Sequence, residues 1–102
     1  MRVMIDLCVV PMGVGVSVSS YVTLCQRIIK DAGLDHQMHA FGTNIEGEWD
    51  EVFAVVKACH EAVHKAGADR VTTSMRVGTR TDRLQSIEDK IESVNRKLAD
   101  SE

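Results

Sequence analysis

The chain has 102 residues, of which 44% are hydrophobic and 26% are charged, and its formal net charge is −3 at pH 7. This is the length of one domain and the composition of an ordinary globular protein. The slight negative charge gives no electrostatic reason to expect a nucleic acid or an anionic membrane as a partner.

We expect neither a secretory signal peptide nor a membrane-spanning segment. The apolar start of the chain is interrupted by Asp6 and Pro11, and no run of about 18 apolar residues occurs. The three cysteines are odd in number, widely spaced and without a C-x-x-C pair, and they are Cys8, Cys25 and Cys59. We therefore expect reduced, buried thiols in a cytoplasmic protein rather than disulfides or a cysteine zinc site.

The first half of the chain predicts a strand, a helix and two short extended segments. Residues 3–10 are rich in β-branched residues, and Pro11 is expected to stop this strand. A helix is expected from an N-cap at Ser17 to about residue 32. Residues 35–41 and 43–46 are expected to be extended and to meet at Gly42, either as a hairpin or as one bent strand.

The second half predicts helix, strand, helix. The first of these helices starts near residue 48, with an inner face of Trp49, Val52, Phe53, Val56, His60 and Val63. Residues 69–79 alternate as a strand does. The last helix is expected over 82–100, with an apolar stripe of Leu84, Ile87, Ile91, Val94 and Leu98.

This order of elements predicts an α+β, ferredoxin-like βαββαβ fold: an antiparallel four-stranded sheet with two helices on one face, plus an extra C-terminal helix. Residues 1–81 form the expected ligand-binding domain. Residues 82–102 form a helix that packs on this domain or, by our preference, on a neighbouring subunit.

Two helices on one face leave the other face of the sheet open. Alternation in the first strand places Val3, Ile5, Leu7 and Val9 under the helices, and it places Met4, Asp6 and Cys8 on the open face. We expect Arg76 to lie near Asp6 there and to form a buried ion pair. A face that is half polar suits a subunit interface or a ligand, because a buried charge needs only a partner.

His60-Glu61-Ala62-Val63-His64 is an H-E-x-x-H string on a predicted helix. Two histidines one turn apart can share a zinc ion, with the glutamate as general base. A catalytic zinc also needs a third protein ligand, and nothing in the sequence places one. The alternative is a histidine at the edge of the core and another on the surface.

Two glycine-containing segments are candidates for ligand contacts. The segment 13–19 joins a strand to a helix, where backbone N–H groups can bind an anion, but it fits neither the dinucleotide fingerprint nor the P-loop. A flexible turn with a serine cap explains it equally well. In the segment 42–51, Thr43 and Glu46 could bond a polar heterocycle, and two glycines would let a ligand approach the backbone.

Taken together, four strings resemble the family of small thiamine-binding-type proteins, in order from about residue 2 to residue 83. They are Pro11-x-Gly13-x3-Ser17-Val18-Ser19-x-Tyr21-Val22, Gly42-Thr43-x-Ile45-Glu46-Gly47-x-Trp49-Asp50-Glu51-Val52, His60-Glu61, and Arg70-Val71 with Gly78-Thr79-Arg80-x-Asp82. The second string is the specific one. The resemblance implies a ferredoxin-like subunit, dimers formed through the sheet, and commonly tetramers.

The resemblance also implies binding of thiamine or its hydroxymethylpyrimidine half without catalysis, and with no cofactor beyond that ligand. By motif position it implies Ser17, Ser19, Thr43 and Glu46 as ligand-site residues, and Asp6 joins them from the open-face argument. Two alternatives stay open. One is a zinc-dependent hydrolase that uses His60, Glu61 and His64, and the other is an oligomeric regulatory or interaction module.

Overall fold

The computed structural model describes residues 1–15, 18–83 and 86–100. Its elements are β1 (Arg2–Met12), α1 (Ser19–Asp31), β2 (Asp35–His39), β3 (Gly42–Glu48), α2 (Trp49–Lys65), β4 (Arg70–Thr79) and α3 (Ile87–Asp100). The four strands form one sheet in the order β2-β3-β1-β4, and every neighbouring pair is antiparallel. This confirms the predicted ferredoxin-like α+β fold.

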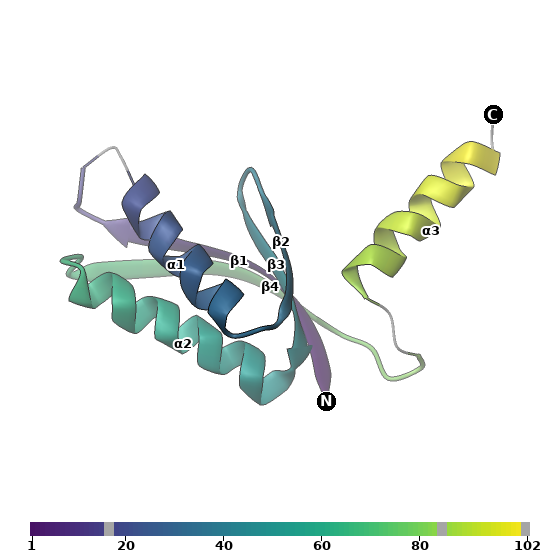
Figure 1. Cartoon of the computed structure of the whole chain (residues 1–102), viewed down its shortest axis with the longest axis horizontal. Coiled ribbons are helices and arrows are strands. Elements are labelled where there is room, and N and C mark those ends of the chain that lie inside the picture. Colours follow the sequence, from purple (N-terminus) through teal and green to yellow (C-terminus); the bar gives the residue numbers. More distant parts are fainter. Residues whose placement is uncertain (16–17, 84–85, 101–102) are drawn as a thin grey trace.

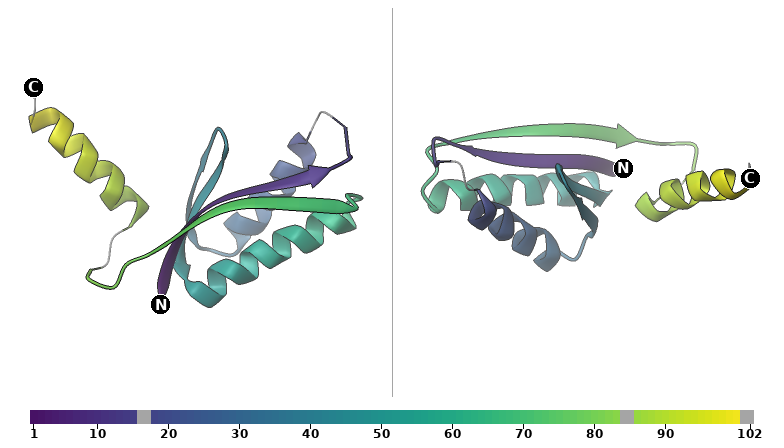
Figure 2. Two further views of the ribbon diagram at one scale, coloured as in Figure 1. Left: turned by 180° about the vertical axis from the view of Figure 1, so that it is seen from behind. Right: turned by 90° about the horizontal axis from the view of Figure 1, so that it is seen from above.

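Helices α1 and α2 lie side by side on one face of the sheet (Figures 1 and 2). The core between the two layers takes Val3, Ile5 and Leu7 from β1, as the alternation predicts, and it takes apolar residues from both helices and from β3. Its fully buried members are Ile5, Ile29, Ile45, Val52, Cys59 and Val63. Burial of these side chains is the main stabilising contribution to the fold.

The first strand is longer than predicted, because Pro11 does not stop it. Strand β1 continues to Met12, and Pro11 is paired with Val71 of β4. The pairing of β1 with β3 ends at Leu7, so beyond this residue one side of β1 is a sheet edge. Proline is tolerated at such an edge, because its missing N–H interrupts no hydrogen-bond ladder there.

Trp49 does not lie in the core as its predicted helical phase suggested. The buried stripe of α2 is Val52, Val55, Cys59 and Val63, and Trp49 is partly exposed. Trp49 is the first residue of the helix, and its backbone N–H donates to the carbonyl of Met1 at the end of the sheet. Its ring instead packs on Phe53, with the ring centroids 4.6 Å apart.

Helix α3 stands away from the sheet and from the other two helices (Figures 1 and 2). The radius of gyration is 15.4 Å, against about 13 Å for a compact domain of this length. The helix begins at Ile87 and not at residue 82, because Ser86 and Asp89 form a capping box. The predicted N-cap Ser17 and the stripe residue Leu84 lie outside the described residues.

Within the ranges that the structure describes, none of the helices is long and apolar enough to cross a membrane.

Candidate functional site

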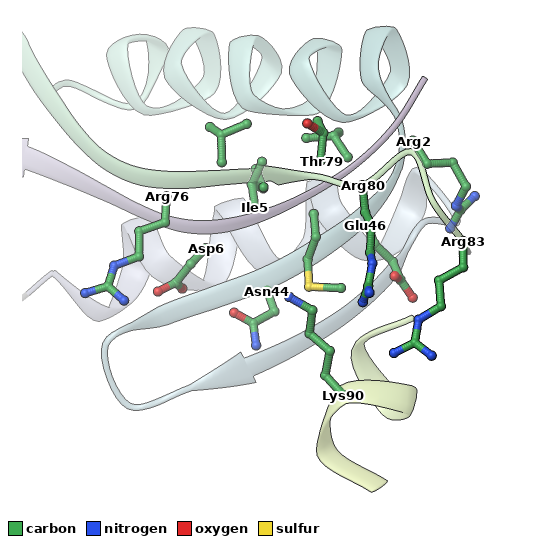
Figure 3. A pocket seen from close by; sticks show the side chains of 14 residues that line it. Arg2, Ile5, Asp6, Asn44, Glu46, Arg76, Thr79, Arg80, Arg83 and Lys90 are labelled. Carbon is green, nitrogen blue, oxygen red and sulfur yellow. The ribbon is translucent and has the colours of Figure 1, made fainter. Parts of the chain in front are cut away.

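The open face of the sheet carries a pocket of about 560 Å³. Its floor is a rectangle of four side chains, since Met4 is paired with Glu46 and Asp6 is paired with Asn44 across β1 and β3. Paired residues on one face have their Cβ atoms about 5 Å apart. The walls come from the end of β4, from the segment that follows it, and from the start of α3 (Figure 3).

Glu46 is the most unusual group in this pocket. The residue as a whole is only 5% exposed, and no hydrogen bond or ion pair reaches its carboxylate from the part of the chain that the structure describes. Its carboxylate oxygens keep some contact with solvent, since among the described residues no buried side-chain oxygen or nitrogen lacks a hydrogen-bond partner. Glu46 points into the pocket (Figure 3), so a ligand that donates hydrogen bonds would supply the missing partner.

Asp6 lines the same pocket, but its carboxylate already has a partner. It accepts a hydrogen bond of 2.6 Å from Nε2 of His39 on β2. The predicted ion pair between Asp6 and Arg76 is wrong, although the two residues are directly paired in register on β1 and β4. The hairpin of β2 and β3 brings His39 within reach of Asp6, and this contact depends on a turn that the sequence pattern did not resolve.

The other predicted ligand residues lie elsewhere. Thr43 faces the helices, where its hydroxyl accepts a hydrogen bond of 2.6 Å from the Gln26 side chain. It lines a second, mainly apolar cavity of about 320 Å³ between β1, α1 and the tip of the β2–β3 hairpin. Ser19 is exposed at the start of α1 and lines neither cavity, and Ser17 falls outside the described residues. Of the predicted ligand residues that the structure describes, only Asp6 and Glu46 line the same pocket.

The two histidines of the H-E-x-x-H string have separate hydrogen-bond partners. Nε2 of His60 bonds the hydroxyl of Thr73 on β4, and Nδ1 of His64 donates to the carbonyl of Ala68 at 2.8 Å. Among residues 1–15, 18–83 and 86–100, no group of three or more His, Cys, Asp or Glu side chains could hold a metal ion. The geometry gives the string a structural role at the end of α2.

Gly42 and Gly47 are packed closely against other residues of the chain, so the protein itself needs a glycine at these positions. A Cβ at Gly42 would clash with the backbone carbonyl oxygen of Leu7, and a Cβ at Gly47 would lie 3.0 Å from the Leu34 side chain. Close packing of β3 against β1 and of the chain before β2 explains both glycines.

Sequence reasoning missed several side chains of the open-face pocket. Asn44 could have been found, because it lies two residues from Glu46 and strand alternation puts both on one face. The basic residues Arg2, Arg83 and Lys90 carry no local signal, since only the path of the chain after β4 brings them to the pocket.

The fold and this pocket define a small ferredoxin-like protein with two helices on one face of its sheet and an open pocket on the other. The sequence profile described as "Thiamine-binding protein" matches residues 5–95, and the chain belongs to this family. It is 64% identical to the UPF0045 protein sll0230 of Synechocystis over 101 residues, which are 99% of this chain and 84% of that protein. It is 45% identical to the UPF0045 protein ECM15 of Eremothecium gossypii, with 98% and 96% covered.

Solved structures share the fold. A hypothetical protein of Methanocaldococcus jannaschii superimposes with a TM-score of 0.85 at 32% identity, covering 92% of this chain and 96% of that chain. A Thermotoga maritima protein named for thiamine biosynthesis or salvage superimposes with a TM-score of 0.79 over 92% and 99% of the two chains. The second match is 19% identical, so it bears on the fold alone.

Proposed function

We propose that this protein binds thiamine or its hydroxymethylpyrimidine half, without catalysis, in the pocket on the open face of the sheet. The observation that carries the proposal is the carboxylate of Glu46, which has no protein partner within the described residues and lines a cavity of about 560 Å³. The family to which the chain belongs supports the choice of ligand class.

The chemistry of an aminopyrimidine suits the four side chains of the floor. Its exocyclic amino group donates hydrogen bonds. An ionised carboxylate, such as that of Glu46, acts only as a hydrogen-bond acceptor. The amide of Asn44, in the next open-face position of β3, can both donate and accept, which suits a ring that offers both kinds of atom. Met4 supplies an apolar, polarisable surface for the ring face.

Calorimetry with thiamine and with hydroxymethylpyrimidine tests this proposal. We expect both ligands to bind, and we expect Glu46→Gln to weaken both by about 10-fold to 100-fold, since a hydrogen bond to a charged group is worth about 1.5–3 kcal/mol. Glutamine keeps the size of the side chain but removes the charge.

Thr43→Val is the matched control, because Thr43 lies on the same strand but faces the second cavity. It should leave the affinity unchanged. If neither ligand gives heat or a thermal shift at saturating concentration, the proposed function is wrong. If Thr43→Val abolishes binding while Glu46→Gln does not, the ligand occupies the second cavity and the assignment of the site is wrong.

We further propose that the protein is a homo-oligomer, a dimer of dimers, in which α3 packs on a neighbouring subunit. Ile91 and Val94 on the apolar stripe of α3 are 45% and 57% exposed in the single chain, and an exposed apolar stripe is typical of an interaction surface. Light scattering should give a multiple of the chain mass, and the double variant Ile91→Ser with Val94→Ser should lower it. A monomeric wild-type protein would contradict this proposal.

The same measurement separates ligand binding from a purely regulatory role. If saturating thiamine changes the mass measured by light scattering, the ligand controls assembly. If the mass is constant and the calorimetric affinity depends on Glu46, the protein is a binding protein whose assembly is independent of the ligand.

A further inference from the structure

Basic side chains gather around the open-face pocket although the chain as a whole is acidic. The formal net charge is −3, with 12 Lys and Arg residues. Five of these line the pocket, against the two carboxylates of Asp6 and Glu46. The five are Arg2, Arg76, Arg80, Arg83 and Lys90. The pocket therefore has a surplus of three positive charges within an acidic protein.

The charges are not spread evenly over the pocket. Arg2, Arg80 and Arg83 gather near the start of α3, and Lys90 extends from α3 toward the floor (Figure 3). Asp6 lies near the opposite end (Figure 3). Glu46 lies between the ends (Figure 3), so a ligand bound to it could reach the basic end.

The basic end is only partly neutralised by the protein. Arg80 makes a two-pronged ion pair with Asp82, at 2.6 and 2.9 Å. Arg83 is close enough to Asp82 and to Asp89 to contribute to the lowered pKa values of both carboxyls. For Arg2 and Lys90, no ion pair or side-chain hydrogen bond occurs within residues 1–15, 18–83 and 86–100.

We infer that the ligand of this pocket is a phosphate ester, with its pyrimidine at Glu46 and its phosphate at the basic end. This inference rests on the proposed function. Thiamine itself carries a permanent positive charge on its thiazolium ring, which a surplus of positive charge opposes. A phosphate monoester carries up to two negative charges, and arginine and lysine are the side chains that proteins use to bind it.

Calorimetry at low ionic strength, with four probes, tests the inference. These are thiamine, thiamine monophosphate, hydroxymethylpyrimidine and inorganic phosphate. We expect thiamine monophosphate to bind at least about tenfold more tightly than thiamine, the size of one charge-assisted hydrogen bond. We expect this advantage to fall as salt is added, because partly exposed charges are screened.

Lys90→Gln should remove most of the advantage of the phosphate ester and leave the affinity for hydroxymethylpyrimidine unchanged. Lys97→Gln is the control, since it removes one positive charge from the same helix but lies outside the pocket lining. It should change none of the affinities. A Lys90→Gln variant with the wild-type preference for the phosphate ester would overturn the inference.

The two proposals can fail separately. If hydroxymethylpyrimidine and thiamine bind but the phosphate adds no affinity, the inference is wrong and the proposed function stands. If the phosphate ester and inorganic phosphate bind while hydroxymethylpyrimidine does not, the basic end binds phosphate and the pyrimidine assignment is wrong. If no probe binds, both are wrong.

Discussion

Asp6 on β1 and His39 on β2 are joined by a hydrogen bond of 2.6 Å, although β3 separates their strands in the sheet. The other ring nitrogen of His39, Nδ1, accepts a hydrogen bond of 3.2 Å from the backbone N–H of Phe41. A nitrogen that accepts carries no proton, so Nε2 must be the protonated one. The two contacts together define the neutral Nε2–H tautomer of His39.

Long-range ¹H–¹⁵N spectra of the imidazole rings check this assignment. His39 should show the Nε2–H tautomer, while His36, whose Nδ1 donates to the carbonyl of Leu34 at 2.9 Å, should show the Nδ1–H tautomer. In Asp6→Ala the tautomer preference of His39 should weaken, and stability should change by less than about 1 kcal/mol because the pair is exposed. The same tautomer for His36 and His39 would contradict the geometry.

We expect removal of the Glu46 charge to raise the stability of the protein and to weaken ligand binding. The residue is only 5% exposed, and its carboxylate keeps some solvent contact but has no protein partner in the described structure. A charge that loses much of its water on folding without gaining a partner is unfavourable. Glu46→Met keeps a similar volume and removes the charge. We expect a higher unfolding temperature, by about 4–8 °C for each kcal/mol in a chain of this size, together with loss of ligand binding. A less stable Glu46→Met variant would show that the carboxylate has a partner in the free protein.

Gly42 should not tolerate a side chain. A Cβ there would clash with the Leu7 carbonyl oxygen and would lie 3.5 Å from a carboxylate oxygen of Asp6. Since these are backbone and short side-chain atoms, β3 would have to move from β1, and we expect Gly42→Ala to cost about 1–3 kcal/mol. Gly78→Ala is the control, because its Cβ would meet nothing closer than the Met4 carbonyl at 3.9 Å. Equal stabilities of the two variants, measured by urea unfolding, would be incompatible with this packing.

The fold could be predicted because each element has its own local pattern. Alternation in β1 and β4, and the 3.6-residue stripes of the helices, survive in the structure with small shifts of phase and boundary. The candidate site could be predicted only in part. Thr43 and Glu46 come from one motif, but they are three residues apart on one strand and so face opposite sides of the sheet. Both residues lie in the predicted extended segment 43–46, so strand alternation could have separated them before the structure was seen.

The contact of Asp6 with His39 and the basic end of the pocket depend on the hairpin turn and on the path of the chain after β4. Lys90 is 44 residues from Glu46 in the sequence, yet both line one pocket. The periodicity of one helix or strand does not show which residues of another element lie beside it. The proximity of these side chains is therefore visible only in the three-dimensional structure.

The capping box at the start of α3 should stabilise that helix. Ser86 and Asp89 exchange two hydrogen bonds of 3.0 Å, from each backbone N–H to the other side chain. We expect Ser86→Ala to destabilise α3 by about 1 kcal/mol, seen as faster amide hydrogen exchange at residues 87–93. Ser93→Ala, in the helix interior, should not speed exchange, because alanine is the better helix former.

The capping box should also stabilise α3 less at low pH. The hydrogen bonds from Ser86 lower the pKa of the Asp89 carboxyl below its usual value. A group whose pKa is lower in the folded state stabilises that state at neutral pH, and this contribution is lost as the pH falls through the lowered pKa. Amide exchange in α3, corrected for its intrinsic dependence on pH, should therefore lose protection in this acidic range in the wild type. The change should be smaller in Asp89→Asn, which has no charge to lose.

The cysteines should differ in reactivity according to their place in the fold. Cys25 and Cys59 are buried between α1 and α2, and Cys8 is half-buried on the open face of the sheet. The hydrogen bond with Cys25 and burial raise the pKa of the Cys59 thiol. The thiolate is the reactive form, so Cys59 should be inert at about pH 8, where an ordinary cysteine is partly ionised.

Mass spectrometry after a short exposure to iodoacetamide checks this order. Cys8 should be modified first, and Cys59 should be modified only at the rate at which the protein opens, so that urea removes the difference. The variant Cys8→Ser should then take up almost no reagent in the native state. If Cys59 in the native protein reacted as fast as Cys8, the packing of α1 against α2 described here would be wrong.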